Sequence, residues 1–370
     1  MTSEARGPDG LDPSCERASP PRHRRGRRPF DRSSYPDGSP GSAVYAALDL
    51  GTNNCRLLVA RPTDDSFRVV DAFSRIIRLG EGLSHTGRIS EAAIERAVGA
   101  LSVCRDKMRA RGVSRARLIA TEACRAAENG EAFRNRIAEE VGLELEVVDR
   151  ETEATLAATG CAPLVAPEAE GVILFDIGGG SSELVLLGRT VRNGGGPASA
   201  KIEAWTSIPI GVVTLAERHG GIEVSPEIYE AMVQEVAEHV APFAQARGCR
   251  NLDRAHLLGT SGTVTTIAGV HLRLPRYDRR RIDGVWLNGG QITNVVDQLL
   301  TMGYQDRVAN PCIGAERADL VLAGCAILEA IRRSYPCARL RVADRGLREG
   351  MLVQMMREDR VWDAPAGAAP

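Results

Sequence analysis

The chain has 370 residues, a formal net charge of −1 and a composition that is 43% hydrophobic and 26% charged. These proportions are typical of a soluble globular protein, and a near-neutral chain gives no electrostatic reason to expect a specific nucleic-acid partner or a membrane. No run reaches the roughly 18 consecutive apolar residues that a membrane-spanning helix needs. At roughly 100–200 residues per domain, the length favours two domains.

Cysteine usage bears on the cellular compartment. The nine cysteines include no CxxC pair and no metal-finger spacing with a histidine. An odd number of cysteines in a chain of this length is typical of reduced, mostly buried thiols. The sequence therefore favours a cytoplasmic protein over a disulfide framework.

The two ends differ from the rest of the chain. Residues 1–42 are rich in Pro, Gly and Ser and carry a basic run at residues 22–28. Because almost nothing in this segment can bury apolar area, we expect a disordered tail. The run can be interpreted as an arm that binds phosphate chains or RNA, or as a solvated tail without a role, and we favour the second interpretation. A second, shorter tail is expected at residues 363–370.

Between the tails, short apolar runs alternate with helical patterns, which predicts α/β layers. The expected strands, in chain order, lie at residues 44–50, 56–60, 117–121, 143–148, 172–177, 183–187, 255–259 and 339–343. Ser90 can cap a helix that stops at Gly112, and Pro226 opens another that stops at Gly248. A third helix is expected over residues 315–333.

The strongest internal signal is a repeated hairpin. Residues 47–59 and residues 174–186 each show an apolar strand with an Asp near its end, a Gly-rich turn and a second apolar strand. Asp49 and Asp176 occupy the same place in the two copies. A single Gly-rich turn is weak evidence because such turns join strands in many folds. Two copies in register indicate two related halves whose turns face each other.

A Gly-rich turn of this kind is suited to phosphate, since backbone N–H groups can approach a ligand closely where no Cβ intervenes. Asp49 and Asp176 would not bind phosphate themselves, but they suit Mg²⁺, which would bridge to the phosphate oxygens. The alternative is two ordinary hairpins whose aspartates cap their turns, and the duplication makes this the weaker interpretation. Residues 259–263 are a third candidate, because they lead from a strand to a helix start, where free N–H groups favour anions.

Several common catalytic motifs are missing from the sequence. The chain has no P-loop and no GxGxxG fingerprint, which argues against a P-loop NTPase and a Rossmann dehydrogenase. HExxH and GxSxG are also absent, so neither a zinc protease nor a nucleophile-elbow hydrolase is favoured.

Seven motifs occur in a distinctive order along the chain, at residues 49–56, 121–125 with 129–130, 151–154, 176–183, 259–263, 314–319 and 344–350. This ordered set resembles exopolyphosphatase / guanosine pentaphosphate phosphatase (Ppx/GppA) proteins over about residues 44–357. The resemblance implies the actin-like, sugar-kinase-like ATPase fold of the ribonuclease H-like class. In that fold, two duplicated α/β domains, each with a mixed five-stranded sheet, close over an interdomain cleft that holds phosphate. We expect the first domain at residues 43–168, the second at 169–338, and a C-terminal strand and helix at 339–362 packed at their interface.

The resemblance also implies roles for individual residues. Glu153 corresponds to the glutamate that acts as base toward the attacking water, and it follows an expected strand at residues 143–148 and begins an Ala-rich helix. The alternative for Glu153 is a solvated first-turn glutamate that offsets the helix dipole. For Arg125 the alternative to phosphate binding is a surface ion pair. The metal and water-coordinating acids correspond to Asp49, Asp176 and Glu183. The phosphate-binding set corresponds to Gly51, Thr52, Asn53, Asn54, Arg56, Arg125, Gly178, Gly179, Gly180, Ser181, Ser182, Gly259, Ser261 and Gly262.

Two positions depart from the family pattern. Asp283 stands where a histidine is usual, and Asn54 replaces a commoner serine while keeping a hydrogen-bonding side chain. Asp283 follows the densest basic stretch of the folded region, which is either a track for a polymeric anion or a solvated loop, and which consists of Arg273, Arg276, Arg279, Arg280 and Arg281. Longer family members append a helical region with His-Asp metal motifs, and because no His-Asp dipeptide occurs here, we expect the short two-domain form.

The expected function is that of a metal-dependent phosphoanhydride hydrolase that releases terminal orthophosphate from inorganic polyphosphate. Hydrolysis of guanosine pentaphosphate to the tetraphosphate is the alternative within this class. A polyphosphate:ADP phosphotransferase and an alarmone-binding regulator are the alternatives outside it. Mg²⁺ is the expected cofactor, with Mn²⁺ and K⁺ as further candidates, and the resemblance also implies a homodimer.

Overall fold

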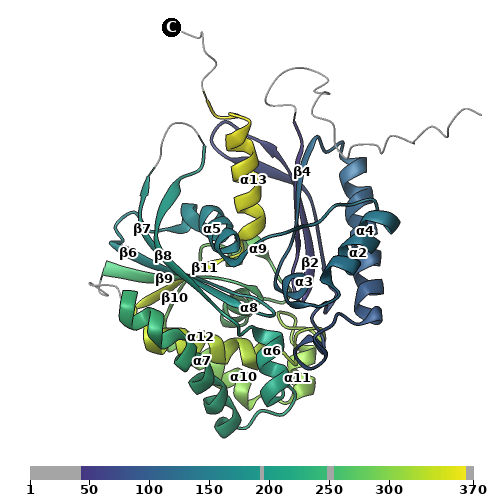
Figure 1. Cartoon of the computed structure of the whole chain (residues 1–370). Helices are drawn as coiled ribbons and strands as arrows, with labels where there is room; N and C mark the ends of the chain where they lie inside the picture. Colours follow the sequence, from purple (N-terminus) through teal and green to yellow (C-terminus); the bar gives the residue numbers. More distant parts are fainter. Residues whose placement is uncertain (1–42, 192–195, 248–253, 364–370) are drawn as a thin grey trace, which may run out of the picture. The chain divides into compact units, whose positions relative to one another are not determined.

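The computed structural model describes residues 43–191, 196–247 and 254–363 (Figure 1). The predictions for the N-terminal tail, and for all of the C-terminal tail except Asp363, lie outside the described residues. Within the described residues, no helix combines the length and the apolarity that crossing a membrane requires.

The first sheet has five strands in the order β3-β2-β1-β4-β5. In chain order these are β1 (Tyr45–Leu50), β2 (Asn54–Pro62), β3 (Phe67–Ile76), β4 (Arg115–Ala120) and β5 (Glu146–Val147). β1 pairs antiparallel with β2 and parallel with β4. Alternate residues of a strand point to opposite faces, so Ala46, Leu48 and Leu50 pack under helices α2 (Glu91–Ala110) and α4 (Gly130–Glu140). Tyr45 and Ala47 face the opposite side.

The second sheet has six strands in the order β10-β11-β9-β6-β7-β8, so the expectation of five was wrong for this sheet. Its strands are β6 (Gly171–Ile177), β7 (Ser182–Val191), β8 (Ser199–Ile208), β9 (Ala255–Thr260), β10 (Trp286–Asn288) and β11 (Arg339–Ala343). One face packs on the helices α7 (Pro226–Arg247), α8 (Gly262–His271), α10 (Gly289–Thr301) and α12 (Val321–Ser334). The extra strand is β10, three residues that add antiparallel to β11.

Two helices lie between the sheets, as Figure 1 shows: α5 (Arg150–Cys161) and α13 (Leu347–Glu358). α5 packs its alanines against the second sheet, and α13 packs its methionines against the first sheet. The two helices approach each other closely. A Cβ on Gly160 of α5 would lie 2.0 Å from the carbonyl oxygen of Gly346, and a Cβ on Gly350 of α13 would lie 2.0 Å from that of Leu156. Glycine is therefore required at both positions.

The remaining helices are short: α1 (Leu83–Thr86), α3 (Glu122–Ala126), η2 (Ala162–Leu164), α6 (Val212–His219), α9 (Arg279–Ile282) and α11 (Tyr304–Ala309). The predicted helix starts are confirmed at Ser90, whose hydroxyl accepts a hydrogen bond from the N–H of Ala93, and at Pro226. The predicted stop at Gly248 lies outside the described residues. The third helix was expected from residue 315 but begins at Val321, because residues 315–320 form turns.

Candidate active site

The two Gly-rich turns have the same local structure. In the first turn the N–H of Gly51 donates to the carbonyl of Asn54 at 2.8 Å, and in the second the N–H of Gly178 donates to the carbonyl of Ser181 at 2.9 Å. The strands that follow pair in equivalent register, Asp49 opposite Arg56 in one hairpin and Asp176 opposite Glu183 in the other. The predicted repeat of the strand-turn-strand unit is confirmed.

The two turns meet each other. A Cβ on Gly179 would lie 2.9 Å from Cβ of Thr52 and 3.2 Å from the N of Asn53, so the second turn can approach the first only with glycine at position 179. A cavity of about 140 Å³ lies between them, and Asp49 and Asp176 both line it. The two aspartates therefore share one opening, as the repeat predicts.

Acidic side chains are concentrated at this cavity, which Asp49, Glu153, Asp176 and Glu183 line together. Burial and then the charge of Glu183 raise the pKa of Asp176 to about 8. Burial also raises the pKa of Asp49 and of Glu183, although hydroxyl groups of Ser181 and Ser207 donate to the Glu183 carboxylate at 2.8 and 2.9 Å. So many buried carboxylates are stable as anions only if a cation or donor groups lie nearby.

The donor set fits a hard cation such as Mg²⁺. Within the described residues, no cluster of three or more His, Cys, Asp and Glu side chains is arranged to hold a metal. Mg²⁺ commonly takes only one or two carboxylates and completes its shell with water and phosphate oxygens, and Asp49 and Asp176 supply such a pair. The buried side-chain oxygens of Asn53 and Asn54 also have no hydrogen-bond partner within the described residues, so the first turn has polar atoms left for a ligand.

Glu153 opens on the same cavity and is held in place by Arg125. It is the fourth residue of α5, whose N-cap Asp149 accepts a hydrogen bond from the N–H of Thr152 at 2.7 Å. One guanidinium nitrogen of Arg125 lies 2.6 Å from Oε1 of Glu153 and donates also to the Val148 carbonyl. Burial and then the Glu183 charge raise the pKa of Glu153, and Arg125 opposes that rise. Glu153 is therefore a buried, oriented carboxylate with an increased affinity for protons, as a general base requires.

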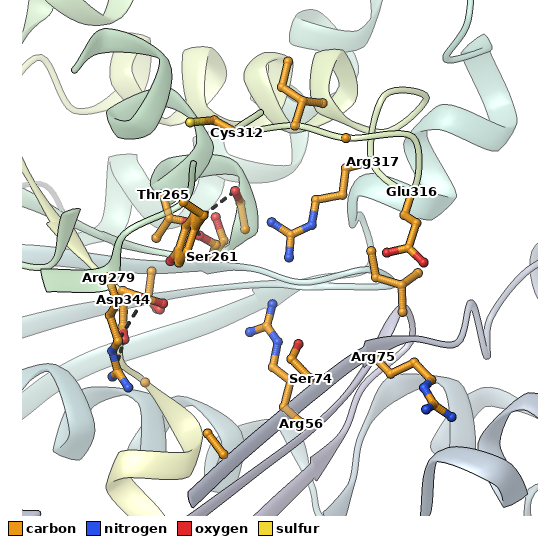
Figure 2. Close-up of a pocket in the computed structure, with 18 of the residues that line it drawn as sticks. Arg56, Ser74, Arg75, Ser261, Thr265, Arg279, Cys312, Glu316, Arg317 and Asp344 are labelled. Atoms are coloured by element: carbon orange, nitrogen blue, oxygen red, sulfur yellow. Dashed lines mark hydrogen bonds and ion pairs between the residues drawn. The ribbon is translucent and has the colours of Figure 1, made fainter. Parts of the chain in front are cut away.

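A second, larger cavity of about 860 Å³ continues from the first and shares Asp49, Asp176, Arg56 and Arg317 with it. Figure 2 shows Arg56, from β2, and Arg317, from the loop before α12, pointing toward each other across this space. No carboxylate in the described part of the chain forms an ion pair with either guanidinium, and burial followed by the Arg56 charge lowers the pKa of Arg317. Two opposed arginines without a carboxylate partner are chemically suited to bind an anion.

Sequence reasoning missed two arginines at the cavities. Arg317 lines both cavities and Arg348, near the start of α13, lines the larger one. Both lie inside motifs that carry the family resemblance, which was the available signal. Arg317 was missed because the pattern over residues 315–333 predicts a helix, whereas the structure has a turn at Arg317.

Three of the predicted phosphate-binding residues do not line the smaller cavity. Ser182 is fully buried, and its hydroxyl donates to the Ile210 carbonyl at 2.7 Å. Gly259 lies within β9, where a Cβ would meet the ring of Phe175 at 2.5 Å, so its role is in packing. Arg125 forms ion pairs with Glu122 and Glu153. This agrees with the alternative prediction of an ion pair, except that the pair is partly buried at the edge of the cavity and not on the surface. The other predicted residues line the cavity.

The basic stretch contributes one side chain to the larger cavity. Arg279 lines it and is paired with Glu349 at 2.6 Å and Asp344 at 3.5 Å, while Arg273, Arg276, Arg280 and Arg281 are exposed. Binding of a polymeric anion along the stretch stays a prediction.

Asp283, at the position where the resemblance implies a histidine, anchors the turn before α13. Its carboxylate binds the guanidinium of Arg345 through both oxygens and accepts the N–H of Asp344 at 3.0 Å. The Arg345 carbonyl in turn accepts hydrogen bonds from Thr260 at 2.7 Å and from Cys161.

We expect Asp283→Asn to lower the free energy of unfolding by about 1–3 kcal/mol, because it leaves a half-buried guanidinium without its charged partner. Urea titration of the full chain measures this effect. Glu168→Gln is the matched control, since it removes the exposed Glu168–Arg339 pair at 2.8 Å and should cost less than about 1 kcal/mol. Equal losses in the two variants would show that Asp283 has no anchoring role.

The fold and the site together define a class of protein: an actin-like ATPase fold, with two mixed sheets, duplicated glycine turns and a cleft lined by both. The sequence pattern of the Ppx/GppA phosphatase family matches residues 58–359, and the chain belongs to this family.

The known proteins that are similar to the chain carry two different names, guanosine pentaphosphate pyrophosphatase and exopolyphosphatase. A guanosine-5'-triphosphate,3'-diphosphate pyrophosphatase of Aeromonas hydrophila is 28% identical over 327 residues, covering 87% of this chain and 61% of the relative. The chain thus spans about three fifths of the length of the curated relatives it matches. An exopolyphosphatase structure from Cytophaga hutchinsonii superposes with a TM-score of 0.77 at 25% identity, covering 85% of this chain and 98% of the other. The structure of the Aquifex aeolicus Ppx/GppA family member superposes with a TM-score of 0.69 at 28% identity, covering 86% of this chain and 98% of the other.

Proposed function

We propose that the protein hydrolyses a terminal phosphoanhydride bond and releases orthophosphate from inorganic polyphosphate. The observation that carries this proposal is the shared cleft: the oriented carboxylate of Glu153, both glycine turns and the opposed Arg56 and Arg317 all line it. A phosphoryl group bound there would have donors on its oxygens and a base beside it, which is what phosphoryl transfer to water needs.

In the proposed reaction, Glu153 accepts a proton from a water molecule whose oxygen attacks the terminal phosphorus. The bond from phosphorus to the bridging oxygen breaks, and the shortened chain leaves with that oxygen. Backbone N–H groups of the two turns and the guanidinium groups of Arg56 and Arg317 bind the terminal phosphate oxygens. Arg125 keeps the Glu153 carboxylate in a fixed position throughout.

Mg²⁺ is part of the proposal, with Asp49 and Asp176 as its ligands and Glu183 orienting the water around it. When bound, the cation would neutralise charge on the phosphate oxygens. The raised pKa of Asp176, which reflects burial and neighbouring acids, supports this assignment because a cation would relieve the same repulsion.

Guanosine pentaphosphate is the second candidate substrate, since the Aeromonas hydrophila relative is named for it. The larger cavity is lined by Phe73 and Tyr277 as well as by arginines, so it offers both aromatic and cationic contacts to a distal group. A cytoplasmic location belongs to the proposal, supported by cysteines that form no disulfide within the described residues. The homodimer remains a prediction from the resemblance.

The test compares orthophosphate release from long-chain polyphosphate, guanosine pentaphosphate and ATP, each with Mg²⁺ or with EDTA. We expect polyphosphate to be the best substrate and EDTA to lower the rate by at least about 100-fold, since a bound metal supplies several kcal/mol of transition-state stabilisation. Adding ADP and assaying ATP tests the phosphotransferase alternative. If the protein bound guanosine pentaphosphate but released phosphate from none of these substrates, the hydrolase proposal would be wrong and the alarmone-binding regulator would be favoured.

A further inference from the structure

Arg78 occupies an unusual place beside the first glycine turn. The segment that follows β3 is tied to this turn by its backbone: the N–H groups of Ile77 and Arg78 donate to the Asn53 carbonyl at 2.9 and 3.1 Å, and the N–H of Gly80 donates to the Thr52 carbonyl at 2.9 Å. The backbone at Arg78 is therefore attached directly to the turn.

The side chain of Arg78 reaches from the first half of the molecule to the second. Its two terminal nitrogens bind the two oxygens of Asp319 at 2.8 and 3.0 Å, and one of them also donates to the Glu316 carbonyl at 3.3 Å. Glu316 and Asp319 flank Arg317. A bidentate fork of this kind fixes orientation as well as distance.

Two features show that this arrangement is held against opposing forces. Arg78 has a φ of 46°, in the left-handed region that non-glycine residues rarely adopt. Arg56 and Arg317, which lie on the two sides that Arg78 connects, are like charges pointing at each other (Figure 2). A strained residue persists where its surroundings determine its conformation, and repelling arginines stay close only if something restrains them or an anion lies between.

We propose that Arg78 is a positioning residue that joins the phosphate-binding turn at residues 51–54 to the loop that carries Arg317. Through its backbone and its guanidinium together, Arg78 sets the separation between Arg56 and Arg317 and therefore the geometry of the anion site. The identity of the substrate rests on the proposed function, but the link itself concerns the binding of any polyphosphate anion.

A second contact also joins the two halves near Arg78. The carboxylate of Glu217, in α6, accepts hydrogen bonds from the N–H of Gly82 at 2.8 Å and from the hydroxyl of Ser84. Because this contact does not involve Arg78, variants at Arg78 keep part of the interface. They should weaken the link to the Arg317 loop without separating the two halves.

The test uses Arg78→Asn, Arg78→Asp and the charge swap Arg78→Asp with Asp319→Arg, all in the full chain. Asn and Asp tolerate a positive φ better than other non-glycine residues, so these changes remove the guanidinium without straining the backbone. Arg333→Asn is the matched control, because Arg333 forms a similar fork with Glu230, at 2.6 and 3.0 Å, within the second half alone.

We expect Arg78→Asn and Arg78→Asp to raise the Kd for tripolyphosphate and the KM for polyphosphate by about tenfold, within the range typical of coupled sites. Turnover at saturation should change less than about threefold, because Glu153 and Arg125 are untouched. The swap should restore most of the affinity, and Arg333→Asn should leave it unchanged. A loss confined to kcat, or no rescue by the swap, would overturn the proposal.

Hydrogen exchange of the backbone amides provides a readout that needs no turnover. The amides of residues 314–320 should exchange faster in Arg78→Asp and return toward the wild-type rate in the swap. If the wild type hydrolyses no phosphoanhydride, the proposed function fails while this measurement still decides the role of Arg78. Unchanged exchange at residues 314–320 in Arg78→Asp would show that no such link exists.

Discussion

Replacing Glu153 by Gln is expected to lower turnover by at least about 100-fold, the scale of a missing general base. Gln has nearly the same shape, and its carbonyl oxygen can still accept the hydrogen bond that Arg125 donates to Oε1 of Glu153 at 2.6 Å. What is lost is the ability to take a proton. The KM should therefore change little, since phosphate binding falls to the turns and to the arginines across the cleft.

Glu122 provides the matched control for this experiment. It lines the same cavity, but its carboxylate is bound by both Arg125 and Arg150. With two guanidinium groups on it, Glu122 should remain ionised and unavailable as a base, so Glu122→Gln should cost less than about tenfold in turnover, below the usual range for a general base. Equal rates for Glu153→Gln and the wild type, or a larger loss in Glu122→Gln, would remove Glu153 from the proposed mechanism.

The pH profiles of the wild type and of Glu153→Gln provide a further check on Glu153 as the general base. Burial and the Glu183 charge raise the pKa of Glu153 above the 4.5 of an ordinary glutamate. A base works only when deprotonated, so kcat/KM should fall as the pH decreases through this raised pKa, and the acidic limb should lie well above pH 4.5. The residual activity of Glu153→Gln should lack that limb.

The parts of the site that the sequence predicted are those encoded locally. An apolar strand, an Asp and a Gly-rich turn occupy consecutive positions, so Asp49 and Asp176 could be placed from the pattern alone. Their duplication added the one long-range fact, that two such turns face each other. The close approach of Gly179 to Thr52 is the packing that makes this possible.

The parts that were missed depend on partners distant in the sequence. Nothing near Arg317 shows that it faces Arg56, and nothing near Arg125 shows that Glu153 lies 28 positions along the chain at hydrogen-bond distance. The edge strand β3 was overlooked because its exposed and half-buried residues follow no strict alternation. Tertiary contacts, which a local pattern does not encode, decide these features.

The junction between the halves is where a small change should have the largest effect on stability. A Cβ on Gly160 would lie 2.0 Å from the carbonyl oxygen of Gly346 and 2.9 Å from the N of Gly350, which are both backbone atoms. Real Cβ atoms do not approach so closely, so Gly160→Ala must push α5 and α13 apart. We expect a loss of about 3 kcal/mol or more in the free energy of unfolding, as for severe overpacking of a core.

Gly99→Ala is the matched control. Gly99 is an exposed residue inside α2, and a Cβ there would meet nothing within 4 Å. Alanine should stabilise the helix by about 0.5–1 kcal/mol, because glycine loses more backbone entropy on folding. Urea unfolding of both variants measures the contrast, and a Gly160→Ala protein as stable as the wild type would show that the two helices are not in this close contact. Because α5 carries Glu153, the displaced helix should also move the carboxylate away from the glycine turns, so Gly160→Ala should lose turnover even at temperatures where it remains folded.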